Sequence, residues 1–152
     1  MIDKFETKVL VLTGIAIMVF IFCILYAMGH RKSDVPECVP FDKSYTRPRI
    51  NKIDDSTYQV FSVARMWAFE PAEIYIPAGS RVDFYVTSLD VVHGFYIAEK
   101  DVNMMAEYGS ITKTTVRFEQ PGVYKITCHE YCGTGHQAMQ AEVIVNFLHP
   151  QP

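Results

Sequence analysis

A run without a charged side chain, residues 9–28, restricts how this chain can fold more than any other feature. Its 20 residues would measure about 30 Å as a helix, which matches the hydrocarbon core of a bilayer. A lipid-exposed segment of this kind has to be helical, because no water is present to satisfy its backbone N–H and C=O groups. A signal peptide has a shorter apolar core followed by a small-residue cleavage site. Here the run continues into Gly29, His30 and Arg31, so we expect a retained single-pass anchor within residues 1–32.

Charge does not fix the direction of this anchor. Lys4 and Lys8 precede the apolar run and Arg31 and Lys32 follow it, so the positive charges are balanced across it. Beyond the anchor, residues 33–56 are polar and carry three prolines. Proline fixes φ and removes a hydrogen-bond donor, so we expect these residues to form an irregular connector.

After the connector the apolar pattern changes to that of β-strands. Residues 81–87 and 114–118 alternate apolar and polar side chains, as half-buried strands do. Two more strands are predicted at residues 124–128 and 141–145, with proline- and glycine-containing turns at short spacing. A chain of 152 residues has room for one compact domain besides the anchor. The pattern predicts an all-β domain over residues 57–152, folded as a Greek-key sandwich or barrel.

One short segment of this domain, residues 128–139, gathers sulfur and imidazole donors. The spacing Cys-x3-Cys-x3-His-x2-Met places Cys128, Cys132, His136 and Met139 within it. Soft sulfur donors mixed with imidazole select copper or zinc over calcium and magnesium. Zinc sites seldom use a thioether, whereas copper electron-transfer sites often carry one as a weak axial ligand. Met139 therefore favours copper.

The presence of two cysteines points to two metal ions. A mononuclear blue-copper site uses one thiolate, two imidazoles and a weak axial ligand. With both Cys128 and Cys132 available, each sulfur can bridge a pair of copper ions, and each ion then needs one imidazole. His136 supplies one imidazole, and we expect His93, near another strand, to supply the second. The weak ligands would be Met139 on one ion and a backbone carbonyl of the loop on the other.

Two simpler interpretations of the same residues stay open. Cys128 and Cys132 form a disulfide in the first, which suits an oxidising compartment but leaves His136 and Met139 unexplained. In the second, two cysteines and two histidines hold a zinc ion.

The loop and the segment around His93 resemble the binuclear copper (CuA) domain of cytochrome c oxidase subunit II. That family shows D-x-x-H, then PG-x-Y, then C-x-E/Q-x-C-G-x-x-H-x-x-M. This chain has Asp90 and His93, residues 121–124, and the complete loop. The resemblance runs from about residue 58 to residue 145 and implies a cupredoxin-like fold. It also implies six metal ligands: the side chains of His93, Cys128, Cys132, His136 and Met139, and the main-chain carbonyl of Glu130.

The resemblance implies an electron-transfer subunit of a haem-copper terminal oxidase. Such a subunit takes electrons from cytochrome c into the binuclear copper and passes them to haem in subunit I. Oxygen is reduced to water there, with proton translocation. The chain shows no acid–base or nucleophile constellation, so no turnover is expected from it alone. The resemblance also implies a single-pass protein of the inner (plasma) membrane, with the copper domain on the periplasmic, outer side.

Some implied features are more specific. The single apolar run is similar to the short form of the ba3-type oxidase branch, which implies a small extra membrane-helix subunit beside it. Family members with Glu at the position of Glu130 use its side chain to hold magnesium at the subunit I interface, so a magnesium ion is implied here. Trp67, the only tryptophan, is expected to pack in the core, with electron acceptance from cytochrome c as the alternative.

Charge bears on the choice of partner. Residues 33–152 carry 10 Lys and Arg against 15 Asp and Glu, a net charge of −5. Negative charge would steer a basic cytochrome c, and the absence of a basic patch argues against nucleic acid. Two other classes of protein stay open: a CuA electron-accepting subunit of a nitric oxide reductase, and a membrane-anchored copper-binding assembly protein.

Overall fold

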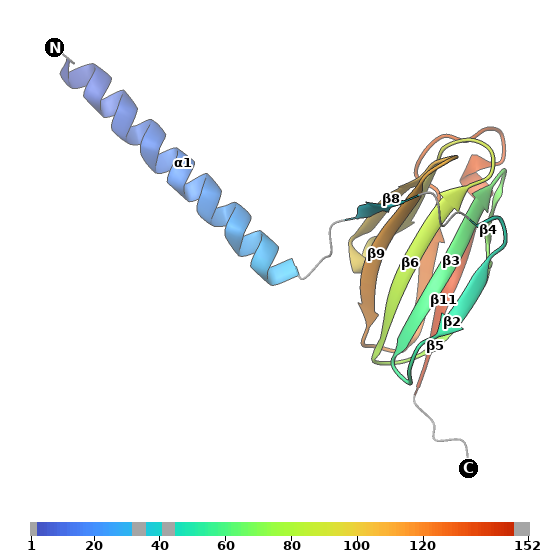
Figure 1. Ribbon diagram of the computed structural model, residues 1–152. Helices are drawn as coiled ribbons and strands as arrows, with labels where there is room; N and C mark the ends of the chain where they lie inside the picture. The colour runs from blue at the N-terminus through green and yellow to red at the C-terminus, as the bar shows by residue number, and fades with distance from the viewer. Residues whose placement is uncertain (1–2, 32–35, 41–44, 148–152) are drawn as a thin grey trace. The chain divides into compact units, whose positions relative to one another are not determined.

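The computed structural model describes residues 3–31, 36–40 and 45–147 (Figure 1). The chain divides into two compact units, Met1–Ser33 and Asp34–Pro152. Parts of the expected connector, at residues 32–35 and 41–44, lie outside the described residues, and so does the end of the expected β domain at residues 148–152.

Among the described residues, the first unit contains the helix α1 (Lys4–Arg31). Its start carries a capping box: the Asp3 carboxylate accepts from the N–H of Phe5, and the Glu6 carboxylate accepts from the N–H of Asp3. These two bonds satisfy backbone donors that the first helical turn leaves free. By length and composition α1 is a candidate membrane-spanning helix, as expected from the apolar run.

The second unit holds two β-sheets. The first sheet has the strand order β1-β9-β6-β3-β2, with β4 pairing to the free end of β3. All of its pairs are antiparallel except β3 with β6, which run parallel. Its strands are β1 (Glu37–Val39), β2 (Arg49–Lys52), β3 (Thr57–Arg65), β4 (Ala68–Glu70), β6 (Ser80–Ser88) and β9 (Ile111–Phe118).

The second sheet has the order β5-β11-β10-β7-β8. Strands β5 and β11 run parallel, and the other pairs are antiparallel. Its strands are β5 (Glu73–Pro77), β7 (His93–Ile97), β8 (Val102–Ala106), β10 (Gly122–Thr127) and β11 (Gln140–Asn146), and two short 3₁₀ turns, Ala98–Lys100 and His136–Ala138, lie in the loops.

The core lies between the two sheets because alternate residues of each strand point inward. In β6, for example, Val82, Phe84 and Val86 are fully buried. Phe84 packs on Phe95 of β7 with ring centroids 5.5 Å apart, and Phe69 meets Phe95 edge-on at the same distance. These rings join the two sheets into one sandwich.

This architecture confirms the predicted all-β class, and the four predicted strands correspond to β6, β9, β10 and β11. The expectation of an irregular connector was wrong in part. Two of its segments form β1 and β2, which pair with β9 and β3 at opposite edges of the first sheet. Both are too short to show a two-residue apolar period, so their pairing partners, rather than local pattern, make them strands.

Tyr45 fastens the connector to the first sheet. Its hydroxyl donates to the carbonyl oxygens of Ser62 (2.9 Å) and Tyr85 (2.6 Å), which belong to neighbouring strands. The ring packs edge-on against Phe61 at 5.2 Å between centroids, and the Arg49 guanidinium lies 3.8 Å above the Phe61 ring. The connector is therefore part of the β domain.

Replacing Tyr45 by phenylalanine should lower the free energy of unfolding by about 1 kcal/mol, because a buried hydroxyl and its hydrogen bonds are lost while the ring remains. Urea unfolding of the full-length chain in detergent measures the change. Tyr108→Phe is the matched control, because the Tyr108 side chain is 73% exposed. Equal unfolding midpoints for the two variants would contradict the anchoring role of Tyr45.

Candidate metal centre

The predicted metal-binding residues meet at one end of the sandwich. His93 is the first residue of β7, and Cys128 follows the last residue of β10 directly. The loop from residue 128 to residue 139 joins β10 to β11 and is closed by a bond from the Cys128 N–H to the Met139 carbonyl (3.2 Å). Ligand atoms of His93, Cys128 and Cys132 all lie within 4.8 Å of one another. Two segments separated by more than 30 residues thus build one cluster.

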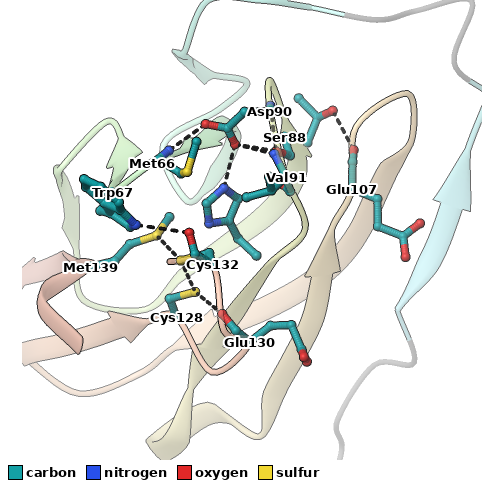
Figure 2. A network of polar contacts seen from close by, with 12 residues as sticks. Met66, Trp67, Ser88, Asp90, Val91, Glu107, Cys128, Glu130, Cys132 and Met139 are labelled. Atoms are coloured by element: carbon teal, nitrogen blue, oxygen red, sulfur yellow. Dashed lines mark hydrogen bonds and ion pairs between the residues drawn. The ribbon is translucent and has the colours of Figure 1, made fainter. Parts of the chain in front are cut away.

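The sulfur atoms form the middle of this cluster (Figure 2). The Sγ atoms of Cys128 and Cys132 are 3.7 Å apart, which is far beyond the S–S bond length of about 2 Å. The Cys132 Sγ also lies 3.7 Å from the Nδ1 of His136 and 3.8 Å from the Sδ of Met139. The Cys128 thiol points to the Glu130 carbonyl oxygen at 3.2 Å. The structure therefore brings together all six predicted donors and has two free thiols instead of the alternative disulfide.

Asp90 orients the His93 ring. Its Oδ1 lies 2.8 Å from the Nε2 of His93, and its Oδ2 accepts from the Met66 N–H at 2.7 Å. Burial acts to raise the pKa of Asp90, but hydrogen bonds from His93 and from the N–H groups of Met66 and Val91 outweigh it and hold the pKa below its usual value. A carboxylate facing Nε2 keeps the ring proton there, so the lone pair of Nδ1 stays available.

Burial shapes the chemistry of the thiols. Cys132 is 5% exposed, and Met139 beside it is 2% exposed. Burial, together with the hydrogen bond to Cys128, raises the pKa of the Cys132 thiol to about 11. A metal ion that binds Cys132 must therefore displace a thiol proton, as metal binding to cysteine generally does.

The donor set fits copper. The Nδ1 of His93 is buried and has no hydrogen-bond partner. Burying such a nitrogen costs free energy unless another group binds its lone pair. Two thiols lie within 4.8 Å of a ligand atom of the same ring, and a second imidazole and a thioether lie beside Cys132. Thiolates, imidazoles and a weak thioether are the ligands that copper electron-transfer sites use.

The structure places Trp67 differently from expectation. The core-packing interpretation was wrong: Trp67 lies in the turn between β3 and β4, is 43% exposed, and does not belong to the buried core. Its Nε1–H donates to the Cys132 carbonyl at 3.1 Å, so the side chain rests on the metal loop. No local pattern in the sequence indicated this contact, because the two residues are 65 positions apart.

Two β-sheets form a sandwich, and thiol, imidazole and thioether groups cluster at one of its ends. This combination is that of a cupredoxin-like, copper-binding domain. The family described as cytochrome C oxidase subunit II, periplasmic domain, matches residues 39–146. The chain belongs to this family.

Individual relatives agree with this assignment. Cytochrome c oxidase subunit 2 of Thermus thermophilus is 35% identical over 88 residues, which cover 58% of this chain and 65% of the relative. Alternative cytochrome c oxidase subunit 2 of Bradyrhizobium diazoefficiens is 34% identical over 76 residues, which cover 50% of this chain and 27% of the relative. The chain thus spans less than two thirds of the length of these curated relatives.

Solved structures extend the comparison to the fold. A chain in the cryo-EM structure of a heme-copper terminal oxidase dimer is 40% identical with a TM-score of 0.83, and the match covers 94% of this chain and 100% of that one. The periplasmic domain of subunit II of cytochrome oxidase from Bradyrhizobium japonicum is 19% identical with a TM-score of 0.55, over 59% of this chain and 84% of that one. The second match supports the cupredoxin-like fold alone.

Proposed function

We propose that this chain is the electron-accepting subunit II of a haem-copper terminal oxidase. Its relative in the cryo-EM structure is part of a heme-copper terminal oxidase dimer. In this proposal cytochrome c delivers electrons to this chain, which passes them to haem in subunit I, where oxygen is reduced to water with proton translocation. The observation that carries the proposal is the pair of thiols 3.7 Å apart, close to the buried ring of His93, whose Nδ1 has no hydrogen-bond partner.

The proposed cofactor is a binuclear copper centre, which supplies a one-electron acceptor when bound. Six donors would hold it: the side chains of His93, Cys128, Cys132, His136 and Met139, and the carbonyl of Glu130. Their placement on the first residue of a strand and on a closed loop supports the proposal. Donors held by a rigid sandwich move little when charge changes, and small movement favours fast electron transfer.

The surface beside the site suits a redox partner. Side chains next to the two ligand segments are apolar and exposed, including Met66 (48%), Trp67 (43%) and Val91 (41%). We propose that cytochrome c docks here and that Trp67 receives the electron. The net charge of −5 over residues 33–152 would steer a basic partner from a distance, while the apolar side chains would make the close contact.

The remaining proposals concern placement and partners. Residues 1–32 would anchor the chain in the inner membrane in a single pass. Residues 33–56 would follow the anchor and, through β1 and β2, form part of the domain. Residues 57–152 would carry the copper centre on the periplasmic side. Subunit I and a small membrane-helix subunit would be its neighbours in the bilayer. The side chain of Glu130 is exposed, so it is free to hold magnesium at the subunit I interface.

Electron paramagnetic resonance of the copper-loaded, full-length chain tests the function directly, with copper and zinc counted per chain. We expect two copper ions per chain and one unpaired electron coupled to two equivalent copper nuclei. Coupling to a single copper nucleus, or a chain that holds zinc, would overturn the proposal. Co-purification of a haem-containing subunit from the native membrane tests the partner, and a chain that gives copper away to another protein would instead be an assembly factor.

A further inference from the structure

The turn between β3 and β4 contacts both segments that carry the predicted ligands (Figure 2). Trp67 lies at one end of the contact, where its Nε1–H donates to the Cys132 carbonyl at 3.1 Å. Met66 lies at the other end, where its backbone N–H donates to the Asp90 Oδ2 at 2.7 Å. The base of the turn is held by an ion pair between Arg65 and Glu70. Two neighbouring residues thus contact the metal loop and the His93 segment, which lie far apart in the sequence.

The indole ring lies directly against the backbone of the metal loop. A Cβ atom added to Gly135 would overlap the six-membered and five-membered rings of Trp67, and one added to Gly133 would come within 3.1 Å of its Nε1. Gly133 also has a φ of +117°, which strongly favours glycine. The loop can therefore lie flat on the indole only because these two residues have no side chain.

Asp90 links Met66 of the turn to the predicted ligand His93. One carboxylate oxygen accepts from Met66 and the other faces the His93 Nε2 at 2.8 Å. The Asp90 side chain is itself fixed, since the Val91 N–H also donates to it at 2.7 Å. Movement of the turn would therefore change the positions of both Cys132 and His93.

The geometry points to a clasp, formed by Met66, Trp67 and Asp90, that holds the His93 segment and the metal loop in register before any metal binds. None of these three residues is a predicted ligand, so each acts as a positioning residue. This role is separate from the proposed receipt of an electron by Trp67, because it needs the indole N–H and the contact with the loop backbone. The clasp depends on the proposed copper site only in the experiments with bound copper.

Thiol alkylation of the metal-free, full-length chain tests the clasp without copper. Peptide-resolved mass spectrometry gives the rate at Cys132, and exposed Cys38 serves as an internal reference in each sample. Trp67→Phe keeps a ring on the loop but loses the N–H, so Cys132 should react about fivefold faster, the effect of one net hydrogen bond. Trp67→Ala loses the ring as well and should raise the rate at least about tenfold. Tyr108→Ala is the control, because it removes an aromatic side chain that is 73% exposed.

A second variant tests whether the clasp acts as a unit. Asp90→Asn keeps one carbonyl oxygen but cannot accept from both Met66 and His93, so it should also speed alkylation of Cys132, which Asp90 does not bond. The double variant Trp67→Phe, Asp90→Asn should then react no faster than the quicker single variant, since either change already opens the clasp. Rates that multiply would mean two independent contacts and would overturn the inference.

The copper-loaded variants supply the measurement that a purely structural role would not move. In Trp67→Phe we expect the two copper hyperfine couplings to become unequal and copper release to a chelator to accelerate about fivefold. Alkylation rates and hyperfine couplings within twofold of the parent chain in Trp67→Ala would refute the clasp. If the parent chain binds no copper pair, the proposed function fails, and the alkylation rates still decide the clasp.

Discussion

Replacing Cys132 by serine should abolish the proposed two-copper centre. Cys132 has the most central position of the predicted donors, with Cys128, His136 and Met139 all within 3.8 Å of its sulfur. A serine hydroxyl stays protonated near neutral pH and is a hard oxygen donor, so it cannot bridge two copper ions as a thiolate does. The variant should bind at most one copper ion per chain, and any spectrum should show coupling to a single copper nucleus.

Cys38→Ser is the matched control for this experiment. Cys38 is an exposed free cysteine on β1, an edge strand of the first sheet. The control should keep two copper ions per chain and an unchanged spectrum. Retention of the copper pair in Cys132→Ser would show that Cys132 is not a copper ligand. Loss of the pair in Cys38→Ser would show that Cys38 takes part in copper binding.

Replacing Phe95 by alanine should cause the largest loss of stability, about 3–5 kcal/mol of unfolding free energy. Phe95 is fully buried and packs on both Phe69 and Phe84, so its removal leaves a cavity where the two sheets meet. Domains of this size are stable by only about 5–15 kcal/mol, so the variant would lie close to spontaneous unfolding. Copper affinity should fall as well, because β7 also carries His93.

Urea unfolding of the metal-free chain measures this effect without a contribution from metal binding. Phe147→Ala removes the same side chain from a position that is 77% exposed, so its unfolding midpoint should stay close to that of the parent. A midpoint for Phe95→Ala equal to that of Phe147→Ala would mean that the sheets do not depend on this ring.

The ligand loop and the strands around it could be predicted because the patterns that indicate them lie within short, continuous segments of sequence. The spacing of Cys128, Cys132, His136 and Met139 is contained in one segment, and the loop stays a single hairpin connection in the structure. Strands β6 and β9 bury one face, so their alternating side chains follow the two-residue period of a half-buried strand. The assignment of these residues as copper ligands stays a prediction, which the spectrum of the copper-loaded chain will test.

The parts that could not be predicted depend on contacts between distant residues. Trp67 looked like a core residue because large aromatic side chains dominate cores, and only the fold shows that it lies on the metal loop. Tyr45 gave no local indication that its hydroxyl reaches Ser62 and Tyr85. The same is true of β1 and β2, whose short lengths carry no periodic pattern of their own.

The parallel pairing of β5 with β11 has a consequence for how the protein folds. Glu142 of β11 is aligned with Glu73 of β5, so this edge of the sheet closes only after the segment following the metal loop has been synthesised. Contacts of such long sequence separation form late and slowly in folding. The strand that directly follows the predicted ligand loop therefore joins this edge of the sheet late in folding.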